Sequence, residues 1–372
     1  MMQSRAHIAY LDRLRVFAAA SVVWMHTAAA GLRNGVDWSW HLCNLLTSLA
    51  FTAVPLFFMI SGYLLLSDPR TADVGQLRRR LPRLLAPLAC WTLAAALWNC
   101  AAVGDFSPGD HFPKLVGALY QPILLPYWFV YTLLGVYLVS PLLSAGLRAS
   151  GRGGKLLVLA LAGLVSLRAM LRPFLPDAWQ GYLDLDILNK LSAWGGNLLL
   201  FALGYCLGTT ERRFDRRLLL AVAVLCYGLI AVGTWQRTAA RGEFDDLFLT
   251  QSAGFEVLLA ACLFLLAKQH WNDPSRFLQT SGLPPLLLPI YFLHAIALRV
   301  LGQFGVNPLR FPETLGVAAL VFVGCALLSK TLASIRPLCY PLTGLRWADA
   351  RARCSWGHSF RRRKESETPG NN

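Results

Sequence analysis

The sequence predicts an all-α, polytopic membrane protein with about ten transmembrane helices and both termini in the cytoplasm. Hydrophobic residues make up 55% of the 372 residues and charged residues only 15%, which leaves too little polar surface for a soluble domain of this length. Long apolar runs follow one another along most of the chain, and short basic clusters separate them. These observations predict the class of protein, the positions of its transmembrane helices and their orientation in the membrane.

Ten runs of mostly apolar residues, each about 17 to 25 residues long, are sufficient to cross roughly 30 Å of hydrocarbon. We place them, to within a few residues, at 14–32, 43–66, 82–103, 122–143, 156–175, 191–208, 218–235, 252–270, 283–301 and 313–335. Residues 1–345 then form one membrane domain. We expect residues 346–372 to form a basic, disordered cytoplasmic tail, because they are rich in charged and polar residues.

The basic residues determine the predicted orientation. With a cytoplasmic N-terminus, 23 of the 35 lysines and arginines fall in cytoplasmic segments and only 7 in outer loops. Because basic residues favour the cytoplasmic side, both termini are predicted to lie inside. The net charge of +15 then suits anionic membrane lipids and needs no nucleic acid partner.

Nine cysteines are scattered along the chain, mostly within apolar runs, and none forms a C-x-x-C pair. We expect them to pack as small buried residues rather than to bind a metal or form a disulfide framework. The sequence therefore predicts no metal site.

The first apolar run carries Arg15 and, eleven positions later, His26. A helix separates them by about 16 Å along its axis, so Arg15 lies near the cytoplasmic surface and His26 about halfway across. An ionisable residue at that depth is a functional-site hypothesis by default. Alone, Arg15 is typical of an arginine that reaches lipid headgroups, and His26 of a histidine that hydrogen-bonds between helices. Imidazole is, however, also the usual general base near neutral pH.

Further arginines, Arg79, Arg80 and Arg83, lie at the start of the third run on the same predicted face. Topology alone explains such a cluster, yet the planar guanidinium, which donates two hydrogen bonds at once, also suits phosphate recognition. Ser61 and Gly62, in the second run, are small enough for another group to approach the backbone closely. Together these residues predict a site for a phosphate-bearing cytosolic donor.

A polar pocket at mid-depth is the second prediction. His294 falls near the middle of the ninth run, and Trp128 and Tyr131 open the fourth run from the outer side. With His26, they suggest a pocket that is open to the outside and reached by a donor from the inside.

The predicted outer loops mix carboxylates with flat aromatic side chains. The members are Asp37, Trp38, Trp40, His41, Asp105, Asp110, His111, Asp177, Trp179, Tyr182, Asp184, Asp186, Glu243, Asp245 and Asp246. An interfacial aromatic belt with solvated loop charge explains each residue singly. As a set they are also suited to a sugar, with rings stacking on its apolar faces and carboxylates accepting from its hydroxyls.

Four short motifs occur in order along the chain. They are Arg15 and His26 with ten residues between them, Phe57-Phe58-x-x-Ser61-Gly62, Arg80-x-x-Arg83-x-x-x-Pro87, and Tyr291-x-x-His294. In these motifs and in its ten-span layout the chain resembles the acyltransferase-3 superfamily of integral membrane acyltransferases. The stretches LDRLRVFAAASVVWMH, VPLFFMISGYLLL and WFVYTLLGVYLVSPLL are similar to the O-acetyltransferase type that modifies enterobacterial common antigen.

The resemblance implies transfer of an acyl group, usually acetyl from acetyl-CoA, to a hydroxyl. The implied acceptor is an envelope or exported polysaccharide, or its lipid-linked precursor. The implied location is the bacterial inner membrane, with enzymes of polysaccharide synthesis as partners.

The resemblance also implies roles for the donor side. Arg15, Arg80 and Arg83 would hold the phosphates of coenzyme A, with Arg79 in support. Asp12, one helical turn from Arg15, would orient it.

The remaining implied roles concern the reacting groups. Ser61 and Gly62 would line the donor channel, and His26 would act as general base on the acceptor hydroxyl. The acyl group would pass either directly or through an acyl-histidine intermediate. The pocket near the reacting carbon would be shaped by Trp128, Tyr291 and His294.

Two other classes of protein remain as alternatives. A transporter of a lipid-linked glycan or small anion would also place polar residues at mid-membrane, although the chain has no matched pair of interrupted runs in two halves. A non-catalytic scaffold or sensor on the same fold is the second alternative.

Overall fold

The computed structural model describes residues 8–103, 113, 116–119, 121–176, 179, 186–249 and 254–354, with the backbone alone for 186–195. This described part is built from helices and contains no strand. The chain forms two compact units, of which unit 1 comprises Met1–Asp73, Val139–Pro274 and Pro308–Thr314. Unit 2 comprises Val74–Leu138, Ser275–Asn307 and Leu315–Asn372.

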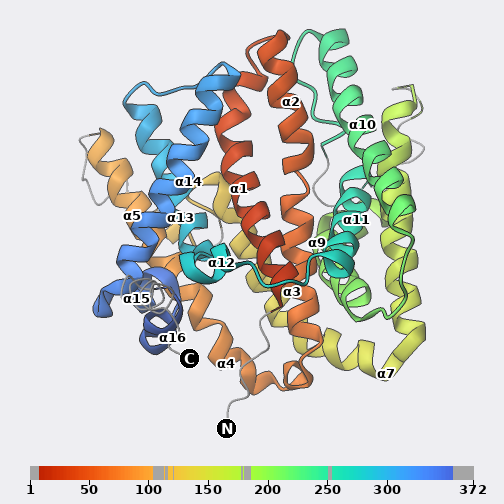
Figure 1. Cartoon of the computed structure of the whole chain (residues 1–372), viewed down its shortest axis with the longest axis horizontal. Helices are drawn as coiled ribbons and strands as arrows, with labels where there is room; N and C mark the ends of the chain where they lie inside the picture. The colour runs from red at the N-terminus through yellow and green to blue at the C-terminus, as the bar shows by residue number, and fades with distance from the viewer. Residues whose placement is uncertain are drawn as a thin grey trace, which may run out of the picture. The chain divides into compact units, whose positions relative to one another are not determined.

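Unit 1 is a bundle of long helices. Its elements are α1 (Ala9–Leu32), α2 (Trp38–Ala50), α3 (Ala53–Leu66), η1 (Pro69–Ala72), the later part of α7 (Trp128–Leu171), η4 (Arg172–Phe174), α9 (Asp186–Thr209), α10 (Arg216–Arg241) and α11 (Gly254–His270). Helix α1 packs against α2 and α3, α3 packs along α9, and α10 packs along α11 (Figure 1).

Aspartate side chains begin two of these helices. A carboxylate oxygen of Asp37 accepts from the backbone N–H of Trp40 at 2.7 Å, which caps α2. Asp215 accepts from Arg217 N–H at 2.7 Å and Leu218 N–H at 3.0 Å, which caps α10. Each bond satisfies a donor that a helix start would otherwise leave unpaired.

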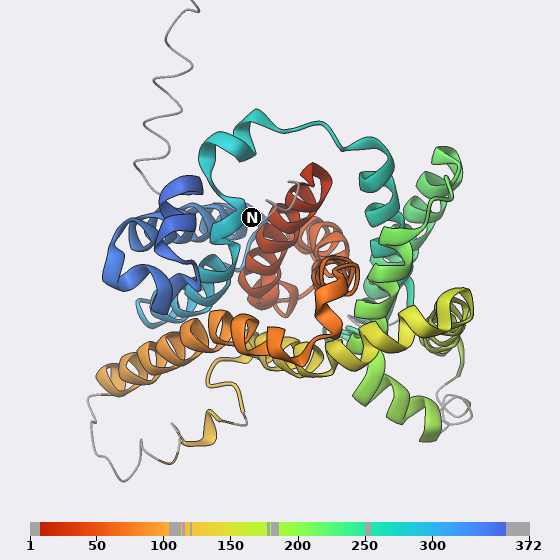
Figure 2. The same cartoon turned by 90° about the horizontal axis from the view of Figure 1, so that it is seen from below.

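Unit 2 contains the other helices. They are η2 (Val74–Gln76), α4 (Leu77–Arg80), α5 (Pro82–Val103), η3 (Leu125–Tyr127), the start of α7, α12 (Arg276–Ser281), η6 (Pro284–Leu286), α13 (Leu287–Gln303), most of α14 (Phe311–Ser334), α15 (Arg336–Thr343) and α16 (Trp347–Arg353). Helix α5 packs against α13 and α15 (Figure 2).

Each of the ten predicted runs is helical over most of its length. The fourth and fifth runs are joined in α7, which bends at Gly151, where φ is +52°. Among the described residues, six helical stretches are long and apolar enough to cross a membrane. They are Trp38–Leu66, Val74–Ala102, Leu125–Phe174, Arg216–Arg241, Pro284–Gln303 and Phe311–Ser334. The protein is therefore a multi-pass membrane protein whose described part is all helical, while the count of ten spans and the orientation of the termini stay predictions.

The predicted disordered tail begins with an ordered helix. Residues Trp347–Arg353 form α16, Ala350 and Cys354 are completely buried, and Cys354 packs against Gly282. Packing of a few small side chains thus accompanies this helix, and the division of the chain into a membrane domain and a disordered tail stays a prediction. Residues 355–372 lie outside the described residues.

All nine cysteines are free thiols, and eight of them are buried. They pack as small apolar side chains, as in the cluster between α10 and α11 that contains Cys226 and Cys262.

Candidate active site

Arg15 and His26 lie on the uninterrupted helix α1. An Nη1 hydrogen of Arg15 is donated to Asp12 Oδ1 at 3.0 Å, and the side chains of Arg15 and Asp12 are 32% and 8% exposed. A guanidinium has five N–H donors. The bond to the buried carboxylate therefore orients Arg15 and leaves donors for a further anion.

His26 is half-buried, although Met25 and Thr27 on either side of it are buried. Near it, one hydrogen bond joins α1 to α2 and another lies within α1 itself. Trp24 donates its indole N–H to Thr47 of α2 at 3.0 Å, and Thr27 donates to the carbonyl of Val23 at 2.8 Å. The imidazole is thus presented from a fixed stretch of helix.

Ser61 and Gly62 lie on α3, where the close approach is made by helix α9. A Cβ atom at Gly62 would overlap the carbonyl oxygen of Phe201, and one at Gly204 would overlap that of Met59. Glycines that let two helix backbones approach are typical of membrane helix packing. We therefore assign Gly62 to helix packing, whereas Ser61 is half-buried and keeps a side chain for other contacts.

The arginines of the third run belong to unit 2. Arg79 and Arg83 are exposed, and Arg80 is half-buried. The end of α15 holds the start of α5, because Gly344 packs against the carbonyl of Arg83 and Trp91 donates to the carbonyl of Leu342 at 2.9 Å. The backbone is thus fixed while the guanidinium groups of Arg79 and Arg83 reach the surface.

Tyr291, His294 and the start of α7 form an aromatic cluster in unit 2. The Tyr291 ring lies 5.5 Å from His294 and 5.6 Å from Phe129, between centroids, and its hydroxyl donates to the carbonyl of Pro126. His294 is completely buried. Trp128 is half-buried beside Phe129, with ring centroids 6.3 Å apart.

Two buried polar residues were missed by the sequence interpretation. Tyr127 is completely buried and donates to the carbonyl of Phe292 at 3.1 Å, so it supports the same cluster. Glu256 on α11 is completely buried, and no described residue hydrogen-bonds to its carboxylate oxygens. Burial of a carboxylate is costly, and its position inside an apolar run was the signal that could have marked it.

Several residues of the predicted outer loops have structural roles. Asp37 caps α2, and Trp40 is buried and donates to the carbonyl of Leu32 at 3.0 Å. Asp245 pairs with Arg237 at 3.0 Å and Arg241 at 2.9 Å. Trp38 and Trp179 remain exposed. The residues of this set that lie outside the described residues are Asp105, Asp110, His111, Asp177, Tyr182 and Asp184.

The predicted site residues divide between the units. Unit 1 holds Asp12, Arg15, His26, Ser61 and Gly62, and within it Asp12 contacts Arg15. Unit 2 holds Arg79, Arg80, Arg83, Trp128, Tyr291 and His294. Within unit 2, Tyr291 contacts His294, whereas the arginines lie on different helices from this pair.

Comparison with known proteins identifies the family. The family model Acyl_transf_3, described as an acyltransferase domain, matches residues 8–330. No curated protein and no solved structure shows significant similarity to the chain. The match spans α1 through most of α14 and includes every predicted site residue. The chain therefore belongs to the acyltransferase-3 family of membrane acyltransferases.

Proposed function

We propose that the protein is an O-acetyltransferase that moves an acetyl group from cytosolic acetyl-CoA to a hydroxyl of an envelope or exported polysaccharide, or of its lipid-linked precursor. The bacterial inner membrane is its proposed location, where it would act beside enzymes of polysaccharide synthesis. Family membership supports acyl transfer. Acetyl as the group and a glycan as the acceptor are what the resemblance of three sequence stretches to enterobacterial common antigen O-acetyltransferases implies.

One observation carries the proposal, namely the arrangement of Arg15 and His26 on α1. Both lie on a single helix, about 16 Å apart along its axis, and Arg15 is oriented by Asp12 at 3.0 Å. An anion-binding group at one end of a rigid segment and a base further along it suit a long donor. Coenzyme A is such a donor, with phosphates at one end and its reactive sulfur at the other.

In the proposed reaction, His26 accepts the proton of the acceptor hydroxyl while the hydroxyl oxygen attacks the thioester carbonyl carbon. The new ester C–O bond forms as the C–S bond breaks, and the leaving thiolate takes the proton back from the imidazole. No proton is gained or lost overall. Proton transfer of this kind typically contributes about 10²- to 10⁴-fold to the rate.

In this proposal, the arginines bind the phosphates of coenzyme A. Arg15, Arg80 and Arg83 hold the donor phosphates, with Arg79 in support, because guanidinium groups bind phosphate oxygens in pairs. Ser61 lines the donor channel, while Gly62 acts through helix packing. The aromatic cluster of Trp128, Tyr291 and His294 shapes the acceptor pocket, with the completely buried His294 acting through packing.

The test is a transfer assay with the full chain in lipid nanodiscs. Acetyl-CoA labelled in the acetyl group is incubated with an envelope glycan extract, and label that mild alkali releases from the glycan fraction is counted as ester. Wild-type protein is expected to transfer label, and the Arg15→Ala/His26→Ala double variant is not. His270→Ala, at the exposed end of α11, is the matched control and should transfer normally.

Two outcomes would overturn the proposal. One is equal transfer by the wild type and the double variant. The other is movement of a glycan across the bilayer without ester formation, which would favour the transporter alternative.

A further inference from the structure

Unit 1 contains an apolar recess that the proposed reaction does not use. It lies between the later part of α7, the end of α9, the start of α10 and α11, and its volume is about 930 Å³. Binding pockets commonly measure roughly 300–1,000 Å³. The wall is mostly aliphatic and includes Leu159, Leu167, Leu203, Leu218, Val222 and Leu258.

The recess is long as well as apolar. Lys155 and Met170 of α7 both line it, and fifteen residues of helix span about 22 Å. One leaflet of a bilayer has a hydrocarbon depth of about 15 Å, half of the usual thickness. The recess is therefore long enough to take one acyl chain of a lipid.

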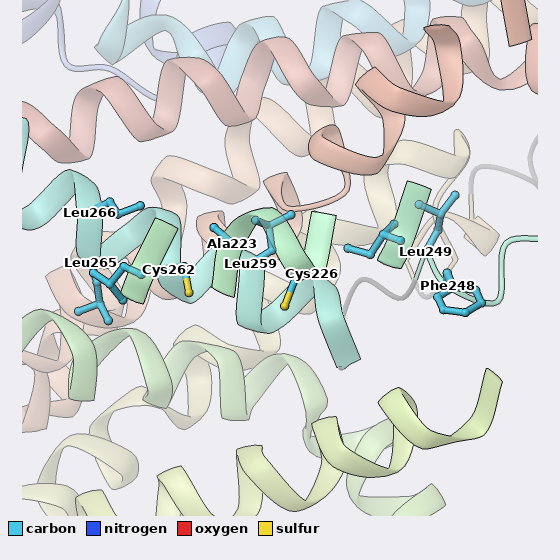
Figure 3. Packing of buried hydrophobic residues seen from close by; sticks show 10 residues of the cluster. Ala223, Cys226, Phe248, Leu249, Leu259, Cys262, Leu265 and Leu266 are labelled. Atoms are coloured by element: carbon cyan, nitrogen blue, oxygen red, sulfur yellow. The ribbon is translucent and has the colours of Figure 1, made fainter. Parts of the chain in front are cut away.

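The inner wall of the recess is firmly packed. Cys262 and Leu265 of α11 line it and also belong to the buried cluster with Ala223 and Cys226 of α10, as Figure 3 shows. Leu159, Leu167, Leu218 and Leu258, in contrast, are exposed. A packed wall with exposed aliphatic side chains around it is suited to an apolar chain entering from the side.

Two cations, Lys155 and Arg212, line the recess at one end. Lys155 Nζ donates to the hydroxyl of Thr209 at 2.9 Å and lies 5.2 Å from the ring centroid of Tyr205. The Arg212 guanidinium lies 5.7 Å from the ring centroid of Phe214. Within the described part of the chain no carboxylate pairs with either cation. Neutral partners hold them, so their charge is available to an anion.

The surface that adjoins this end is also basic. Its charged side chains are Glu211, Arg212, Arg213, Asp215, Arg216 and Lys268. The Asp215 carboxylate is engaged in capping α10. Lys268 donates to the carbonyls of Leu207 and Thr210, at 3.1 and 2.6 Å. The net charge of the side chains at this end of the recess is positive, which complements an anionic lipid headgroup.

We propose that this recess binds an anionic phospholipid of the bilayer, with its phosphate at Lys155 and Arg212 and one acyl chain along α7. A zwitterionic lipid would bring an ammonium group to the same two cations and is disfavoured. A free phosphate would leave the apolar wall uncovered. The site is distinct from Arg15 and His26 and does not depend on the acyl transfer reaction.

The test measures lipids retained by the full-length protein in native mass spectrometry, after exchange into a mixture of long-chain phosphatidylglycerol and phosphatidylcholine. The wild type is expected to retain phosphatidylglycerol preferentially. Because each basic residue near the membrane surface favours an anionic lipid about fivefold, Lys155→Gln/Arg212→Gln should reduce that preference about 25-fold and Arg212→Gln alone about fivefold.

The matched control is Arg152→Gln/Arg217→Gln. It removes the same charge from the same predicted face, but neither residue lines the recess, so the preference should change less than twofold. Ala162→Trp, which fills the recess, should reduce retention of the long-chain lipid. Thermal unfolding midpoints verify that each variant is folded, and Arg212→Gln, at an exposed position, keeps the test valid if the double variant does not fold.

Three results would overturn the proposal. The first is equal retention of the two lipids by the wild type, which would indicate unselective surrounding lipid. The second is an equal loss in the Arg152→Gln/Arg217→Gln control. The third is complete displacement of the lipid by millimolar glycerol phosphate, since the headgroup alone would then account for binding.

Discussion

His26 and His294 are the same residue type within apolar helices, yet their surroundings differ. His26 is half-buried on α1 of unit 1, whereas His294 is completely buried on α13 of unit 2, against the ring of Tyr291. A general base must come within roughly 2.6–3.2 Å of the proton that it removes. Exposure therefore favours His26 as the reacting group and His294 as a packing group. Motif membership alone does not separate the two roles.

The largest expected effect is on turnover in His26→Ala. Loss of a general base should lower kcat for acetyl transfer by about 10²- to 10⁴-fold. Because His26 is only half-buried, the unfolding midpoint should change little. Initial rates of thiol release from acetyl-CoA, in the presence of acceptor, measure the effect.

His294→Ala should show the reverse pattern. Truncation of a buried side chain costs about 2–4 kcal/mol of stability, as for other large-to-small core substitutions, so thermal unfolding should shift more than turnover per folded molecule. The comparison fails if folded His294→Ala loses turnover while His26→Ala keeps it.

Arg83 provides the next test, because it is exposed at the start of α5. Arg83→Gln should raise KM for acetyl-CoA by about 10- to 100-fold with little change in kcat, since hydrogen bonds to charged groups contribute about 1.5–3 kcal/mol. Arg78→Gln, an exposed neighbour on α4, is the control. If both variants raise KM equally, general surface charge explains the effect and Arg83 has no specific contact.

Substitution of Gly62 tests whether this residue contributes to helix packing or to donor binding. Gly62→Ala should destabilise the protein by about 1–3 kcal/mol, the usual cost of overpacking, because its Cβ would meet α9. At Gly228 a Cβ would meet nothing within 4 Å, so Gly228→Ala should leave stability unchanged or slightly higher. Denaturant unfolding measures both. A raised KM for acetyl-CoA at unchanged stability in Gly62→Ala would restore its role in the donor channel.

The smallest expected effect is that of Asp12→Asn. It removes the ion pair with Arg15, which is worth about 0.2–1 kcal/mol at a partly exposed site. We expect KM for acetyl-CoA to rise about two- to fivefold at unchanged kcat, since Asp12 acts only by positioning Arg15. A large fall in kcat instead would indicate that Asp12 takes part in the chemistry.

Much of the helical layout follows from local sequence, because apolar runs of membrane length have one regular structure that satisfies their backbone. Each predicted run is helical over most of its length, and Arg15 and His26 share a helix as their common apolar run predicts. The bend that joins two runs within α7 depends on the positive φ of Gly151, which apolar periodicity does not reveal.

The features of the fold and of the candidate site that the sequence does not predict depend on tertiary contacts between distant segments. A glycine next to Ser61 indicates a close approach, but only the fold shows that Phe201 of α9 makes it. Likewise, Cys354 at the end of α16 packs against Gly282, a contact that the charged composition around it does not reveal. The recess at Lys155 and Arg212 draws on four helices, so no single stretch of sequence reveals it.

The most direct measurement is mass spectrometry of the envelope and secreted glycans from cells that lack the gene and are complemented with either wild type or His26→Ala. The wild type is predicted to restore a glycan mass increased by one acetyl ester, and His26→Ala, expressed at equal level, to leave the glycan unmodified. An equal ester mass in both strains, or none with the wild type, would contradict O-acetyl transfer from the α1 site.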